Sequence, residues 1–168
     1  MTYTFIISDE SVNADGFVIQ TKGIRTERFK KNPVMLYMHA REKGVIGRWD
    51  NIRTEGSQLI ADAVFDENNP LGKEVKERVD GGFLRSASIG LSVLNYERID
   101  GVDTVTDCDL TEVSIVDIPS NRNAVKLFDK RGLIVLSLKE SADGDKDLRT
   151  QLIEVLKLPA TATDGEII

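Results

Sequence analysis

Two long, strand-like segments in the second half of the chain constrain the fold more than any other feature. Residues 86–99, SASIGLSVLNYERI, and residues 104–118, TVTDCDLTEVSIVDI, contain many of the β-branched and apolar residues that strands favour. Asp100 and Gly101 stand between them, and an Asp-Gly pair is typical of the tight turn in a β-hairpin. A mainly β fold built around this hairpin is therefore the first expectation.

Shorter segments around the hairpin complete the predicted secondary structure. A helix should be capped by Asn69, carry Pro70 in its first turn and end at Gly81. Residues 120–130 fit a second short helix, although their AVKLF run fits a strand equally well. Further strands are expected at residues 3–8, 16–20, 33–39, 58–65 and 132–138. The chain is predicted to be mainly β with flanking helices (α+β), in a closed or nearly closed β-barrel.

Composition favours a soluble globular domain. Of 168 residues, 40% are hydrophobic and 30% are charged, and no stretch approaches the roughly 18 apolar residues of a membrane span. The first residues lack the basic start and long apolar run of a secretory signal. A single cysteine, Cys108, excludes an internal disulfide and fits a reducing cytoplasm. The net charge of -6 argues against a nucleic-acid partner, because such a partner favours a basic face.

The sequence also gives no basis for a cofactor or a metal site. One histidine and one cysteine cannot provide the usual ligands of zinc. Residues 66–69, DENN, lack the spacing of an EF-hand calcium loop, and no phosphate-binding G-x-x-x-x-G-K motif occurs. We therefore expect no cofactor and no metal.

The composition changes near residue 138. Residues 139–147, KESADGDKD, include six charged residues and fit a polar linker. An amphipathic helix should follow, with an apolar stripe formed by Leu148, Leu152, Val155 and Leu156. Thr163 and Glu166 then have the spacing of a capping box, which normally begins a helix. We expect one domain over residues 1–138, and the chain to end either as a truncated or processed piece or as a frayed natural terminus.

Catalysis that depends on histidine must use His39, the only histidine in the chain. It follows the apolar run PVMLYM, so it is either a half-buried packing residue or the base of an active site. Ser88 lies in the other informative stretch, with the small residues Ser86, Ala87 and Gly90. Glycine inside a strand often marks a close approach by a ligand or another backbone. A serine that faces an imidazole from such a strand is the arrangement that nucleophilic catalysis needs.

Glu112 is the candidate for the group that orients the imidazole. Strand alternation puts it on one face with Ser114, where a carboxylate needs a partner because burying it alone is costly. That partner is either the histidine or an arginine, for which Arg48 and Arg85 are available. Cys108 is either a small buried apolar residue or a thiol paired with the histidine.

Four ordered blocks resemble the prohead maturation proteases of tailed bacteriophages. The blocks are Asn32-Pro33 leading to His39, then Ile46-Gly47-Arg48, then Ser88-Ile89-Gly90 after a glycine-containing turn, and finally Glu112-x-Ser114 followed by Pro119 and Asn121. The resemblance spans roughly residues 16–126. Two positions depart from the usual pattern, since Leu91 stands where an aromatic residue is common and PSN replaces PAN. Neither departure touches the residues with expected chemical roles.

The resemblance implies an assemblin-like β-barrel, similar in fold to the herpesvirus assemblins, and the activity of a serine endopeptidase. It implies His39 as the base and Ser88 as the nucleophile, with Glu112 as the third member of the triad. We expect the oxyanion hole in the PSNRNA loop, at backbone amides near Asn121 and Arg122.

The resemblance also implies partners and a place of action. The expected substrates are a phage scaffold protein or domain and the major capsid protein, with self-cleavage and a homo-oligomer as further expectations. The expected place is the assembling prohead in the host bacterial cytoplasm, with no nucleic-acid and no membrane partner. Residues 139–168 resemble the segment that joins protease to scaffold in fused phage proteins.

Two other interpretations remain open at this point. A catalytically inactive capsid-assembly or scaffold module would keep the same strands and lack turnover. A β-barrel peptide-binding module with no protease history would give His39, Ser88 and Glu112 no reason to converge.

Overall fold

The computed structural model describes residues 3–127, which form one eight-stranded sheet with two α-helices and two 3-10 turns. The strand expected at residues 132–138 and the linker and helix expected at residues 139–168 lie outside the described residues. The strands are β1 (Tyr3–Asp9), β2 (Phe17–Ile19), β3 (Ile24–Arg25), β4 (Val34–Tyr37), β5 (Gly47–Glu55), β6 (Gln58–Phe65), β7 (Ser86–Ile99) and β8 (Val102–Val116). The helices are α1 (Glu27–Lys30) and α2 (Pro70–Asp80), and the 3-10 turns are η1 (Thr21–Gly23) and η2 (Arg41–Lys43).

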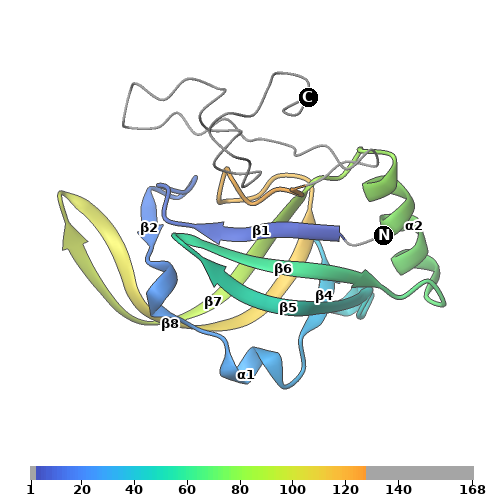
Figure 1. Ribbon diagram of the computed structural model, residues 1–168, viewed down its shortest axis with the longest axis horizontal. Coiled ribbons are helices and arrows are strands. Elements are labelled where there is room, and N and C mark those ends of the chain that lie inside the picture. The colour runs from blue at the N-terminus through green and yellow to red at the C-terminus, as the bar shows by residue number, and fades with distance from the viewer. Residues whose placement is uncertain (1–2, 128–168) are drawn as a thin grey trace, which may run out of the picture. The chain divides into compact units, whose positions relative to one another are not determined.

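Strand β8 is the centre of the sheet. Along one edge it pairs antiparallel with β7, from Ile99 opposite Val102 to Ser86 opposite Val116. Along its other edge the short strands β2, β3 and β4 pair with it in parallel, one after another (Figure 1). This antiparallel pairing of β7 with β8 confirms the predicted hairpin. The 15 residues of β8 are long enough for both of its edges to be paired.

The sheet curls into a nearly closed barrel, as predicted. From β8 the order continues through β4, β5 and β6 to β1. Residues 124–127 then lie between β1 and β7, and we call them the closing segment. Its Val125 oxygen accepts from Ile6 N at 3.0 Å, and its Ala124 oxygen accepts from Ala87 N at 2.9 Å. The closing segment therefore joins the two strands that would otherwise be edges.

The predicted elements differ from the structure in several places. Strand β5 was not predicted, because a register shift between Asp50 and Arg53 breaks the alternation of apolar side chains. The strand expected at residues 33–39 ends at Tyr37, and the chain turns there. The described part of the helix expected at 120–130 is a turn followed by the bridges of the closing segment, so the strand alternative was the better one.

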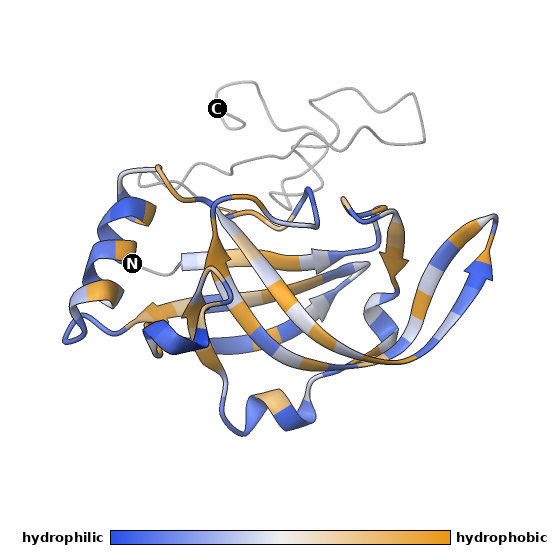
Figure 2. Cartoon of the chain, turned by 180° about the vertical axis from the view of Figure 1, so that it is seen from behind, coloured by the Kyte–Doolittle hydropathy of each residue, from blue (hydrophilic) through white to orange (hydrophobic). Residues whose placement is uncertain are grey.

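Aromatic packing fills the barrel. Trp49 is 1% exposed, meets Phe5 edge to face at 5.6 Å between ring centroids, and donates from its indole nitrogen to the Val113 oxygen at 3.0 Å. Figure 2 shows hydrophobic and hydrophilic residues alternating along β7 and β8, as expected of strands with one face on a core. The core side of β8 includes Val113 and Ile115, which leaves Glu112 and Ser114 on the other face.

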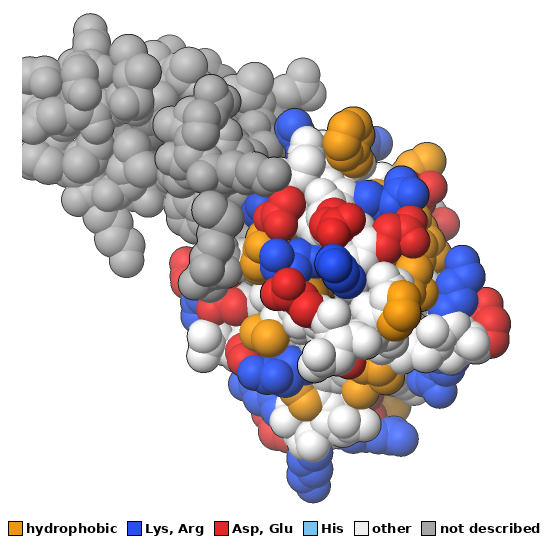
Figure 3. Space-filling view, turned by 90° about the vertical axis from the view of Figure 1, so that its right-hand side faces the viewer, with side chains coloured by type: hydrophobic (Ala, Val, Ile, Leu, Met, Phe, Trp, Pro, Cys, Tyr) orange, Lys and Arg blue, Asp and Glu red, His pale blue; other side chains and the backbone are white. Residues whose placement is uncertain are grey.

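Helix α2 closes one side of the domain, as its sequence predicted. The Asn69 side chain accepts from Leu71 N at 2.9 Å, Pro70 lies in the first turn and Gly81 follows the last. Val75 and Val79 are buried. The outer face carries charges of both signs, as Figure 3 shows for this side of the domain, and includes a 2.8 Å pair between Arg78 and Glu74.

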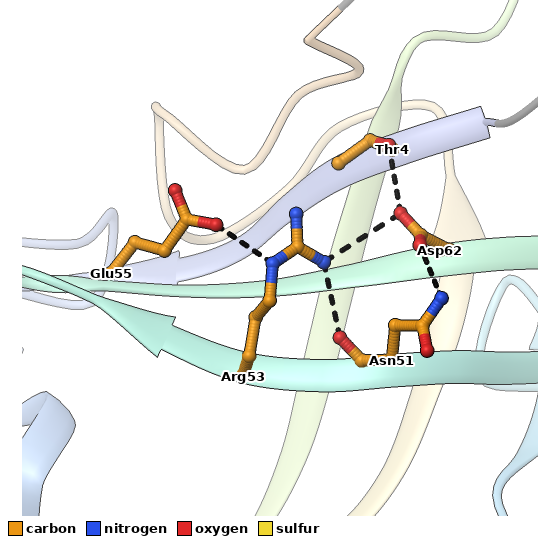
Figure 4. Close-up of polar contacts among 5 residues, drawn as sticks. All are labelled: Thr4, Asn51, Arg53, Glu55 and Asp62. Carbon is orange, nitrogen blue, oxygen red and sulfur yellow. Dashed lines mark hydrogen bonds and ion pairs between the residues drawn. The ribbon is translucent and has the colours of Figure 1, made fainter.

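A polar network ties β1, β5 and β6 together (Figure 4). The Asp62 carboxylate accepts from Thr4 Oγ1 at 2.7 Å and from Asn51 Nδ2 at 2.9 Å. Arg53 lies 3.7 Å from the same carboxylate and donates to Glu55 at 2.7 Å. Since Thr4 lies on β1, Asp62 on β6 and the other three residues on β5, the network joins the three strands around the bulge in β5.

Candidate active site

Ser88 lies on the outer face of β7, directly opposite Ser114 of β8. Its neighbours Ala87 and Ile89 point toward the core, where they pair with Ile115 and Val113. Ser88 is 9% exposed, and its hydroxyl makes no hydrogen bond within residues 3–127. A serine hydroxyl that is nearly buried and makes no other hydrogen bond can donate its proton to a base.

His39 lies in a turn directly after β4. Met38 and His39 both have positive φ angles, of 53° and 56°, which are uncommon for residues other than glycine. The turn is held to β8, because Met38 N donates to the Ile115 oxygen at 3.0 Å and His39 N donates to Ser114 Oγ at 3.2 Å. His39 is an exposed residue, so the packing alternative for it was wrong. Two strained residues that point an imidazole outward are typical of functional sites.

Glu112 contacts the His39 ring. Its Oε1 lies against Nδ1 of the imidazole, and its Oε2 accepts from Ser114 Oγ at 2.7 Å. An ionised carboxylate can only accept hydrogen bonds, so a hydrogen bond to it requires the tautomer with the proton on Nδ1, in which Nε2 is the acceptor of the neutral ring. The arginines considered as partners are engaged elsewhere, since Arg48 pairs with Asp50 and Arg85 donates to the Gly82 oxygen.

Ser114 connects the other three residues, a role that the sequence did not predict. Its hydroxyl accepts from the His39 backbone and donates to the Glu112 carboxylate. Ser88 is its partner across β7 and β8, and Leu36 of β4 is its partner on the other edge. Neighbouring strands lie about 4.8 Å apart. Ser88 and His39 therefore flank Ser114, although no hydrogen bond joins them in the described structure.

Gly90 makes room for the Glu112 side chain. It is the cross-strand partner of Glu112, and a Cβ at this position would lie 2.8 Å from both Cγ and Oε1 of the glutamate. The sequence analysis expected a close approach at this glycine, and the approaching group is the carboxylate that contacts His39.

Two hollows flank these side chains. One, of about 480 Å³, includes Glu112 together with Arg28, Asn32 and Arg41 in its lining. The other, of about 240 Å³, includes Ser88 and Asn121. One hollow thus includes the proposed nucleophile, and the other includes the carboxylate that contacts His39.

The loop expected to supply the oxyanion hole lies beside Ser88. Asn121 is buried, and its side-chain amide donates to the Asp9 backbone oxygen and carboxylate, both at 3.0 Å. This amide is therefore committed to the fold. Arg122 is exposed, and its side chain is not part of either hollow. The backbone N–H groups of Asn121 and Arg122 donate to no acceptor within residues 3–127.

Cys108 is a buried apolar residue in the structure. It is fully buried and pairs with Val93 and Ile24 on the two edges of β8. Burial, with smaller contributions from Asp107 and Asp109, raises the pKa of its thiol to about 11. It lies four positions before Glu112 in the chain, roughly 13 Å along a strand. A thiol pair with His39 is therefore excluded.

Within residues 3–127, no group of three or more histidine, cysteine, aspartate or glutamate side chains is placed to hold a metal ion. No helix in the same part of the chain is long and apolar enough to cross a membrane.

Comparison with known proteins gives one family. The family model for the caudovirus prohead serine protease matches residues 10–133, which include His39, Ser88, Glu112 and Ser114. No curated protein and no solved structure matches the chain.

Proposed function

Since the chain belongs to the caudovirus prohead serine protease family, we propose that it is an active serine endopeptidase with Ser88 as its nucleophile. Family membership supports a protease role in phage maturation, inside the assembling capsid. The observation that most supports the active enzyme is the Glu112–His39 contact, made beside a serine whose hydroxyl is free.

In the proposed reaction, Ser88 Oγ attacks the scissile carbonyl carbon as its proton passes to Nε2 of His39. His39 then gives this proton to the leaving amine, and the peptide bond breaks. Water attacks the remaining ester by the same route, so the enzyme is restored. The proposal requires that a rotation of the ring or of the Ser88 side chain brings Nε2 and Oγ together, because catalytic hydrogen bonds often form fully only when substrate binds.

Glu112 would orient and stabilise the imidazole. Its Oε1 accepts from Nδ1–H, which keeps Nε2 free to act as the base, and its negative charge stabilises the imidazolium that forms. Ser114 holds the second carboxylate oxygen and the His39 backbone, so it is a positioning residue.

We assign the oxyanion donors to the backbone N–H groups of Asn121 and Arg122. Both lack a described acceptor, and Asn121 shares a hollow with Ser88. One such donor typically contributes about 10²–10³ in rate.

The proposed substrates are extended segments of the phage scaffold and of the major capsid protein, with self-cleavage as a further substrate. The setting is the prohead in the host cytoplasm, where a homo-oligomer would bring copies close together. The division into a protease domain over residues 1–138 and a tail leading toward scaffold also stays a proposal.

Mass spectrometry of the full chain tests this function. Wild type, Ser88→Ala and Ser86→Ala are incubated alone and with a denatured bacterial proteome, and the products are identified. Wild type and Ser86→Ala should give the same cleavages, while Ser88→Ala should give none and keep its melting temperature, because one oxygen is removed from a site of small residues.

Greater loss from Ser86→Ala than from Ser88→Ala would contradict the nucleophile assignment. A folded wild type that cleaves nothing would favour the inactive capsid-assembly module.

A further inference from the structure

The hollow beside Ser88 opens where the barrel is not closed. The closing segment pairs with β7 only as far as Ala87, and among the described residues the outer edge of β7 has no strand neighbour beyond it. The gap between this edge and β1 and β2 is the hollow of about 240 Å³. Its lining is half apolar and half polar, and the apolar residues are Ile7, Phe17, Ile19, Ile89, Leu91 and Val93.

Ser8 gives this hollow one unusual polar atom. Ser8 is fully buried and lines the hollow, and its hydroxyl is the one buried side-chain polar atom without a hydrogen-bond partner in the part of the chain that the structure describes. A register shift between Ile6 and Ser8 places Ser8 opposite the core residue Leu59, so its side chain points inward. An unpaired buried hydroxyl is costly, so such groups normally have a partner.

An extended peptide along the free edge of β7 would fill this hollow. Such a peptide adds to the sheet as another strand, and every second side chain then points to the same face. Because Ser88 lies in the lining, a side chain that enters the hollow belongs to a residue close to the scissile bond. The placement of the hollow close to the scissile bond rests on the proposed function, in which Ser88 is the nucleophile.

The charge of the lining decides which side chain fits. Asp15 is the one charged residue that lines the hollow, and its carboxylate already accepts from Ser120 Oγ at 2.7 Å at an exposed rim. A charged side chain would have no counter-charge at the buried end. A purely apolar side chain would leave the Ser8 hydroxyl unpaired.

We propose that this hollow is a specificity subsite for an uncharged side chain with an aliphatic stem and a hydrogen-bonding tip, of the glutamine or threonine kind. The tip pairs with Ser8 Oγ while the stem lies against Ile89 and Leu91. Ser8 would thus determine specificity without taking part in the chemical step.

Matched peptides measure this preference. Cleaved sequences from the proteome digest of wild type are resynthesised with glutamine or methionine, and with threonine or valine, at each position near the scissile bond. One position should favour the polar member of each pair by about tenfold in kcat/KM. Ser8→Ala should bring that ratio to near one, because the hydroxyl that distinguishes the two members of each pair is gone, whereas Ser92→Ala, on the exposed part of β7, should leave the ratio unchanged.

A ratio that Ser8→Ala does not change, or the lack of any such position, would overturn the subsite. A binding measurement keeps the result separate from the protease proposal. Butyramide, which mimics the glutamine side chain, should shift the backbone NMR signals of Ser8, Ile89 and Leu91, and Ser8→Ala should abolish the shifts. NMR shifts with butyramide but no peptide cleavage would contradict only the proposed protease activity. Peptide cleavage with neither the NMR shifts nor the preference for a polar side chain would contradict only the subsite.

Discussion

At the scale of single residues, the contact between Glu112 and His39 depends on the absence of a Cβ atom at Gly90. The Glu112 side chain lies over Gly90, so any Cβ there meets Cγ and Oε1 at 2.8 Å. The neighbouring backbone is paired on β8 and cannot move easily, whereas the glutamate can rotate. A side chain at position 90 should therefore displace the carboxylate from His39.

Gly90→Ala should lower kcat by on the order of 10²-fold, because a shift of about 1 Å in an orienting group has this effect. The thermal unfolding midpoint should change little, because Glu112 can turn toward solvent. Kinetics on a cleaved peptide, with Ser92→Ala as the control on the same strand, measure the effect. Unchanged turnover in Gly90→Ala would mean that Glu112 does not orient the base.

Sequence reasoning proposed the candidate residues and missed the backbone that presents them. His39, Ser88 and Glu112 became candidates from a single histidine, a small-residue strand and an acid within an apolar strand, and the family resemblance implied their roles. The consecutive left-handed residues at Met38 and His39 could not be predicted, because neither is glycine or asparagine. Ser114 had no distinct signal, since its role depends on which strands flank β8.

At the scale of elements, Asp9 holds the loop next to Ser88 in place. Its carboxylate accepts from Ser11 Oγ at 2.6 Å, from Asn123 Nδ2 at 2.6 Å and from Asn121 Nδ2 at 3.0 Å. Burial alone would raise the pKa of Asp9, but these hydrogen bonds outweigh it and hold the pKa below its usual value of 3.8. The ionised carboxylate thus joins the end of β1 to the loop that carries the proposed oxyanion donors.

Asp9→Asn should lower the free energy of unfolding by about 3 kcal/mol near neutral pH, because buried donors lose a charged acceptor. A depressed pKa stabilises the fold fully above pH 3.8, and this contribution is lost as the pH falls through the pKa of the folded state. Urea unfolding of wild type and Asp9→Asn should therefore show a difference that shrinks below about pH 4. A difference that stays constant into strong acid would mean that Asp9 is not ionised in the fold.

The elements themselves were predictable where their pattern is regular. Residues 86–99 form β7 and residues 58–65 form β6 as predicted, and α2 has its predicted cap and end. Strand β5 was missed because its bulge interrupts the pattern of apolar residues. The closing segment was missed because its pairing depends on two strands that are distant in the sequence. The local sequence shows the alternation of apolar residues in strands and the caps of helices. It does not show which residues of distant strands pair with one another.

At the scale of the whole described domain, the site results from the length of β8. A single strand of 15 residues carries Glu112 and Ser114, pairs with Ser88 on one edge and holds the turn with His39 on the other. The remaining strands of the barrel hold these edges at fixed positions, since Trp49 of β5 bonds to Val113 between the two polar residues. The fold therefore accounts for the convergence of residues that are up to 75 positions apart.

The central claim, that Ser88 is a nucleophile activated by His39, is tested most directly by covalent labelling. The full chain is treated with a fluorophosphonate, which forms a stable phosphonate ester with an activated serine, and the modified residue is identified by peptide mass spectrometry. The account predicts one adduct on Ser88, absent from Ser88→Ala and from His39→Ala and present in Ser86→Ala and Cys108→Ala. An adduct on another residue, or equal labelling of Ser88 in His39→Ala, would contradict it.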